Sequence, residues 1–239
     1  FGDPHLDDDG CDWPALERAV SIVGRTQGMY GGNIGDTTNN WVGRLVSLYG
    51  EQHTTRTDEH RLAHWFMHAL PWAYIVGGNH DLWNSGWAVL RELSAGAKIG
   101  LMAPDEVKLE LLSPGGAPCR IHARHNFKGH SMWNPAHGPM RASKLDGWGQ
   151  VYIAGHLHEW VDHREEGLDG EIRWALRTRG FKRFDDYARS NQFHEQKFGE
   201  AVTTVHDPSH PHPGERVRVF LDVEEASENL TWLRKRRGV

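Results

Sequence analysis

The sequence predicts an α/β fold with two sheets and with helices on the outside, and three features support this. A short apolar run over residues 72–76 lies between a proline and a pair of glycines, as expected of a buried strand. Up to about residue 99, predicted strands alternate with amphipathic helices, which is the pattern of α/β proteins. From about residue 107, predicted strands follow one another between turn signals, and we expect them to form the second sheet.

Caps and apolar spacing define the helices of the first half. Asp12 can cap a helix that has Pro14 in its first turn and apolar side chains on one face. The glycine-rich stretch 30–36 reads as a strand that ends in a tight turn with a carboxylate at its tip. Further helices are predicted over residues 41–49, 58–70 and 85–93.

The second half is predicted to be mostly strands. Residues 113–118, with two prolines and two glycines, are a turn signal between two strands. Strands are predicted over residues 107–112, 119–123, 151–154, 160–163, 172–177, 201–205 and 216–221. A loop is predicted over 131–144, a short helix over 184–189 and a closing helix over 222–237. Because neither a repeat nor a flexible linker interrupts the chain, we predict a single domain over residues 1–239.

Composition excludes several classes of protein. The formal net charge is −5, so bulk electrostatics does not favour a polyanionic partner, and any contact with nucleic acid must come from local patches. No apolar stretch is long enough to span a bilayer, and we expect no association with a membrane. Cys11 and Cys119 cannot build a disulfide framework, so we expect a reduced, cytoplasmic setting. The sequence gives no indication of the oligomeric state.

The start of the chain is unusual. Phe1 is not a methionine, and Asp3 and His5 follow at once with no apolar strand before them. We therefore expect that the first strand of the fold is missing or truncated in this sequence. No signal-peptide pattern opens the chain.

Side chains that can bind metals follow the ends of several predicted strands. Open α/β sheets place their ligands at the carboxyl ends of strands. The residues at such positions are Asp3 and His5, Asp36, Asn79 and His80, His125, and His156 and His158. Carboxylate, imidazole and amide ligands together suit Mn, Fe, Zn, Ni or Co, and the lack of cysteine argues against a structural zinc. Even seven ligands from this set of eight residues are too many for one ion and suit two ions that share a carboxylate.

In order along the chain, these motifs resemble those of calcineurin-like metallophosphoesterases. The matching segments are Asp3-Pro4-His5, Gly35-Asp36 with Asn39, Gly78-Asn79-His80-Asp81, the lone His125, and Gly155-His156-Leu157-His158. They span residues 3–158, about two thirds of the chain. The segments 179–181 and 230–234 resemble phage and prophage members. The resemblance implies a four-layer α/β/β/α sandwich with two mixed sheets and with the metals at one rim.

The resemblance also implies a role for each residue. One ion would be held by Asp3, His5, Asp36 and His158, and the second by Asp36, Asn79, His125 and His156. His80 would face the substrate as an acid or a stabiliser of the leaving group, and Asp81 would hold its ring. Mn²⁺ is the expected metal, with Fe, Zn, Ni or Co as alternatives.

Two positions depart from the family pattern. Asn39 stands where many members have aspartate. His125 is flanked by Arg124 and Asn126, so His130 or His122 stays open as the alternative ligand.

The implied reaction is in-line attack on phosphorus by a metal-bridged water. We expect a phosphodiesterase that acts on nucleotides or nucleic acid, with Asn39, His130 and Arg141 as candidate substrate contacts. Aromatic and basic side chains in residues 131–144 and 179–183 suit a nucleobase and a phosphate. The alternatives are a phosphomonoesterase acting on nucleotides or proteins and, from another class, a non-catalytic binding module stabilised by metal.

Overall fold

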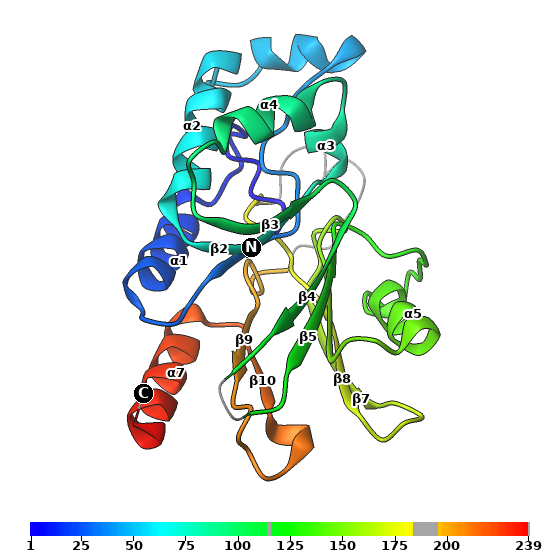
Figure 1. Cartoon of the computed structure of the whole chain (residues 1–239). Coiled ribbons are helices and arrows are strands. Elements are labelled where there is room, and N and C mark those ends of the chain that lie inside the picture. The colour runs from blue at the N-terminus through cyan, green and yellow to red at the C-terminus, as the bar shows by residue number, and fades with distance from the viewer. Residues whose placement is uncertain (114–115, 184–195, 239) are drawn as a thin grey trace.

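The computed structural model describes residues 1–113, 116–183 and 196–238 and confirms a mixed α/β fold (Figure 1). One sheet has the order β1-β2-β3, and all of its strands are parallel. These strands are β1 (Gly31–Asn33), β2 (Trp72–Val76) and β3 (Ile99–Ala103). The prediction that this sheet is mixed is therefore wrong for its described strands.

The second sheet is mixed and has five strands in the order β4-β5-β6-β8-β7. They are β4 (Glu106–Leu111), β5 (Cys119–Arg124), β6 (Val151–Ala154), β7 (Val161–Glu166) and β8 (Ile172–Arg177). The central strands β5, β6 and β8 are parallel, and each outer strand is antiparallel to its neighbour. The late strands β9 (Thr203–His206) and β10 (Val217–Phe220) pair only with each other among the described strands.

The helices begin at capping residues. Asp12 caps α1 (Trp13–Arg25), Thr55 caps α2 (Arg56–Ala69) and Asp222 caps α7 (Val223–Arg237). The shorter helices are α3 (Asn79–Leu82), α4 (Gly86–Leu93), α5 (His137–Asp146) and the 3₁₀ helices η1 (Gly43–Gly50) and η2 (Pro213–Glu215). The helix predicted over 184–189 lies outside the described residues. Among the described residues, no helix combines the length and apolar character that a bilayer crossing requires.

Successive side chains of β2 join two different cores. Ile75 packs with Leu16 and Phe66 from helices α1 and α2. Its neighbours Tyr74 and Val76 point the other way, into a core shared with the five-stranded sheet. A third, smaller core joins α5 to β6. The two sheets are therefore held face to face, which brings loops from both of them to a common edge.

Strand β9 contains a half-buried histidine, His206, whose ring has a consequence for stability. In the described chain, Nδ1 of His206 is buried without a hydrogen-bond partner, and Nε2 lies 3.0 Å from Oγ1 of Thr204. Burial lowers the pKa of His206 to about 4. Because the unfolded chain then binds more protons between about pH 6.5 and pH 4, stability falls as the pH falls through this window.

We therefore expect His206→Gln to flatten the pH dependence of unfolding. The wild type should lose up to about 3 kcal/mol more than the variant between pH 7 and pH 4, measured by urea unfolding. The exposed His212 provides the control, since His212→Gln should keep the wild-type slope. Equal slopes for wild type and His206→Gln would show that the His206 ring is not desolvated.

Candidate metal centre

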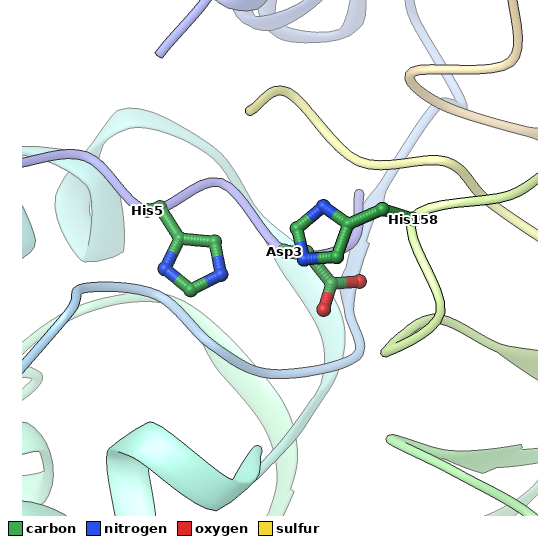
Figure 2. A group of neighbouring side chains, drawn as sticks. All are labelled: Asp3, His5 and His158. Carbon is green, nitrogen blue, oxygen red and sulfur yellow. The ribbon is translucent and has the colours of Figure 1, made fainter. Parts of the chain in front are cut away.

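Loops that follow the parallel strands bring the predicted ligands together. Asp36 follows β1, Asn79 follows β2, His125 follows β5, and His156 and His158 follow β6. The N-terminal segment adds Asp3 and His5, and Figure 2 shows these two side chains gathered with His158. The carboxyl ends of parallel strands meet at one edge, which explains why residues so distant in sequence converge.

Three groups of side chains have ligand atoms close enough to hold a metal ion. Within each group, the ligand atoms lie within 4.8 Å of one another. The groups are Asp3, His5 and His158; His5, Asp36 and His80; and Asp36, His125 and His156. Asp36 and His5 each belong to two groups, so the three groups form one continuous cluster.

The Nε2 atom of His125 lies at the centre of the third group. It is 3.3 Å from Oδ2 of Asp36, 3.0 Å from Oδ1 of Asn79 and 3.0 Å from Nδ1 of His156. The other ring nitrogen, Nδ1, lies 2.8 Å from the carbonyl oxygen of Ile34 and donates to it in the neutral ring. That tautomer turns the Nε2 lone pair towards three other ligand atoms, an arrangement that a cation would stabilise.

The buried charges of the cluster favour a cation. Burial raises the pKa of Asp3 to about 7, and the neighbouring Asp36 adds to the rise. Burial also acts to raise the pKa of Asp36, but the hydrogen bond and charge of His125 outweigh it and hold this pKa well below its usual range. Burial acts to lower the pKa of His125, whereas Asp36 and Asp3 raise it to about 9. The carboxylates of Asp36 and Asp3 thus stabilise positive charge beside His125, and a divalent ion would supply that charge.

One ring nitrogen supports the fit to a metal independently. Nε2 of His5 is buried without a hydrogen-bond partner among the described residues, and Oδ2 of Asp36 lies 4.0 Å away. Nδ1 of the same ring lies 2.8 Å from Oδ1 of Asn39 and is held there. An unpaired buried nitrogen costs free energy unless a partner such as a metal ion binds it. The residues present therefore fit the divalent ions that the sequence predicts.

Strained backbone is concentrated at the predicted ligands. Asp3, His5, Asp36, His156 and His158 all adopt the left-handed region, with φ of 45°, 41°, 51°, 72° and 52°. This conformation costs about 1–3 kcal/mol for a residue with a side chain and persists where surrounding contacts enforce it. One such contact joins the two ends of the motif series, since the amide of His156 donates to both carboxylate oxygens of Asp3 at 3.0 and 2.9 Å.

Gly78 is required where the loops after β1 and β2 meet. A Cβ at this position would overlap the amide nitrogen and the carboxylate of Asp36. We expect Gly78→Ala to lower the free energy of unfolding by about 3 kcal/mol, measured by urea unfolding, and to weaken metal binding. A Cβ on Gly50 meets open space among the described residues, so Gly50→Ala should change stability by less than about 1 kcal/mol. If both substitutions lowered the free energy of unfolding by similar amounts, the close approach of Gly78 to Asp36 would be contradicted.

His80 is held by the backbone on two sides. Its amide donates to Oδ1 of Asp36 at 2.9 Å, and Nδ1 of its ring lies 2.6 Å from the carbonyl oxygen of Asn39. Since a carbonyl only accepts, Nδ1 carries a proton, and Nε2 is the nitrogen left for chemistry. The rings of His80 and His5 are nearly perpendicular, with 5.0 Å between their centroids.

Asp81 holds the loops rather than the ring of His80. Its two carboxylate oxygens accept hydrogen bonds from the amides of Thr37 and Gly78, at 3.0 and 2.9 Å. The expectation that Asp81 orients the imidazole is thus corrected, because the Asn39 carbonyl occupies that position. Burial raises the pKa of Asp81 to about 7, and the charge of Asp36 adds to the rise.

The three expected substrate contacts have different surroundings in the structure. The side chain of Asn39 is fully buried, with Oδ1 on His5 and with Nδ2 donating to Asp8 at 3.0 Å, so it orients a ligand instead of contacting substrate. His130 and Arg141 are exposed, and the guanidinium of Arg141 lies 3.5 Å from the carbonyl of Lys128. Neither belongs to the three ligand groups.

Of the three candidates for the fourth motif, His125 lies in the cluster. The ring of His122 instead lies between Glu106 and Asp146, with N–O distances of 3.0 and 3.1 Å. His130 is exposed, as noted above. The geometry therefore favours His125 over the two alternatives.

Sequence reasoning missed three contributors to the site. Asp7, which belongs to none of the predicted motifs, is fully buried and accepts from the amide of Asn39 at 2.7 Å. The indole rings of Trp41 and Trp83 lie beside His80, with ring centroids 5.5 and 4.1 Å away. The sequence could have indicated the two tryptophans by their position, since each stands within three residues of a motif residue.

Comparisons with known proteins add little to this geometry. No family model matches the chain, and no curated protein matches it. Among solved structures, the chain is similar to a 5′-nucleotidase precursor from Thermus thermophilus, with 14% identity and a TM-score of 0.42. The alignment covers 91% of this chain and 52% of that one, so the chain spans about half the length of the nucleotidase. A likeness at this level assigns neither family nor activity to this chain.

Proposed function

We propose that this chain is a phosphoester hydrolase of the calcineurin-like metallophosphoesterase family that depends on two metal ions. The observation that carries the proposal is the position of Asp36. Its carboxylate lies within ligand distance of His5 on one side and of His125 and His156 on the other. A carboxylate shared in this way is what two adjacent divalent ions require.

The ligand sets follow from the cluster. We assign Asp3, His5, Asp36 and His158 to one ion, and Asp36, Asn79, His125 and His156 to the other. We propose Mn²⁺ as the metal, with Fe, Zn, Ni or Co as alternatives, because carboxylate, imidazole and amide donors together suit these divalent ions. When bound, such ions lower the pKa of coordinated water and neutralise charge on the phosphoryl oxygens.

The chain's own residues orient the substrate and move a proton. His80 donates a proton from Nε2 to the departing oxygen, while Nδ1 stays bound to the Asn39 carbonyl. Asn39 fixes the ring of His5, and Asp81 fixes the amides of the two loops that carry the ligands. These contacts exist before substrate binds, so little reorganisation is needed during the reaction.

The proposed fold is the four-layer α/β/β/α sandwich of this family, in a single domain. Three hydrophobic cores support this proposal. The first lies between helices α1 and α2 and strand β2, the second lies between the two sheets, and the third lies between β6 and α5.

The preferred substrate class is a phosphodiester of a nucleotide or nucleic acid. Exposed Trp133 and Arg141, in the segment that follows β5 along the chain, offer an aromatic ring and a cation, which suit a base and a phosphate. The alternative is a phosphomonoesterase, and the alternative from another class is a binding module stabilised by metal.

Two chromogenic esters distinguish these functions. With Mn²⁺ added, we expect faster hydrolysis of bis-p-nitrophenyl phosphate than of p-nitrophenyl phosphate. Preference for the monoester would favour the phosphomonoesterase. Hydrolysis of neither ester by metal-loaded protein would refute the proposed hydrolase and leave the binding module.

A further inference from the structure

Two tryptophans form an aromatic wall beside His80. The ring of Trp83 lies 4.1 Å from the imidazole, tilted by 39°, and the ring of Trp41 lies 5.5 Å away at 67°. Both indoles are half-buried, whereas His5, the ligand next to His80, is buried. His80 is half-buried as well, so the two indoles are part of the accessible surface around its open side.

The wall is held in place by the loop after β1. Nδ2 of Asn40 donates to the carbonyls of both His80 and Trp83, at 2.7 and 3.2 Å. Asn40 reaches them from a left-handed conformation, with φ of 41°. The indole nitrogen of Trp41 donates to Gln52 at 2.9 Å, which anchors the second ring. The two rings are thus ordered without substrate, which reduces the entropy cost of stacking a ligand on them.

The place of this wall follows from the role of His80, so the inference rests on the proposed function. If His80 protonates the departing oxygen, the rest of the leaving group must extend towards the open side of the imidazole. The surfaces it meets there are the indoles of Trp41 and Trp83. Both indoles lie against the imidazole, and a base carried by a departing ribose is only one sugar ring away from the departing oxygen, so it stays close enough to stack on them.

We propose that Trp41 and Trp83 bind the base of a departing nucleoside, so that the enzyme prefers nucleoside phosphoesters to sugar phosphoesters without a base. Stacking on an aromatic side chain suits any base, because every base has a π-face. The wall therefore selects for the presence of a base and not for its identity.

The test uses two substrates that differ only in the base. AMP and ribose 5-phosphate share the phosphoryl group and the departing 5′-oxygen, so the ratio of their kcat/KM values reports the base alone. If the wild type takes only diesters, the methyl esters of both compounds serve, with release of adenosine or ribose measured. We expect Trp83→Leu and Trp41→Leu each to lower this ratio by about tenfold, mainly through KM for the nucleotide.

Two control variants separate stacking from a positioning role. Trp83→Phe keeps an aromatic face and should retain most of the ratio, and Trp232→Leu on α7, far along the chain, should leave it unchanged. If Trp83→Leu lowers kcat/KM for both substrates by the same factor, the indole only positions His80 and the inference is wrong. A wild type without preference for AMP also overturns it. Absence of hydrolysis of every ester would instead remove the proposed function itself.

Discussion

Replacement of His80 by alanine is expected to lower kcat by about 10²- to 10⁴-fold, while two metal ions remain bound. The reason is that, in the proposed mechanism, Nε2 of His80 protonates the departing oxygen and His80 supplies no ligand that the ions require. Its backbone amide, which donates to Asp36 at 2.9 Å, survives the substitution, so the bridging carboxylate keeps its position. Steady-state kinetics with Mn²⁺ and metal analysis of the same sample provide the two readouts.

His130→Ala is the matched control for this prediction, because His130 is an exposed histidine outside the ligand groups. It should keep both the rate and the metal content. Loss of an ion from His80→Ala would make His80 a ligand, as its place in a group with His5 and Asp36 also allows geometrically. Full activity of His80→Ala would exclude it as the proton donor.

Asp36→Ala is expected to abolish activity through loss of metal from both positions. The carboxylate of Asp36 is the ligand shared by the groups of His5 and His125, and its removal leaves buried histidines without a balancing charge. Activity should fall to the background of the assay, and metal analysis should find less than one ion per chain. Circular dichroism on the same sample checks that the chain is folded.

Asp36→Asn separates charge from hydrogen bonding. The amide oxygen can still accept from the amide of His80, so the loop geometry should persist while metal affinity falls. Asp105→Ala, at an exposed aspartate outside the cluster, should behave as wild type. An Asp36→Ala protein that keeps two ions and full activity would be incompatible with the shared carboxylate.

The fold was predictable where local signals are strong. The apolar run and glycine pair located β2 (Trp72–Val76), and the strand predicted over residues 172–177 coincides with β8. Helix α5 (His137–Asp146) was predicted as loop because its buried face consists of Gly138, Pro139 and Ser143, which form no apolar stripe. Strand β3 was missed because it lies at a sheet edge with no fully buried side chain.

The candidate site was predictable as a set of strand ends, but not in its hydrogen bonds. Parallel strands bring Asp36, His125 and His156 to one edge whatever the loops do, so the motif pattern sufficed. The hydrogen bond from His80 to the Asn39 carbonyl depends on loop conformation, which no spacing rule encodes. For the same reason, sequence could not tell that Asp81 binds backbone amides or that Asp7 is buried.

Titration of the chelator-stripped wild-type chain with Mn²⁺, followed by electron paramagnetic resonance, tests the central claim most directly. If Asp36 is shared by two ions, the chain binds two Mn²⁺, and the loaded protein shows the spectrum of an exchange-coupled pair about 3.5–4 Å apart. Binding of a single Mn²⁺, or of two that give only the spectrum of isolated ions, would contradict it.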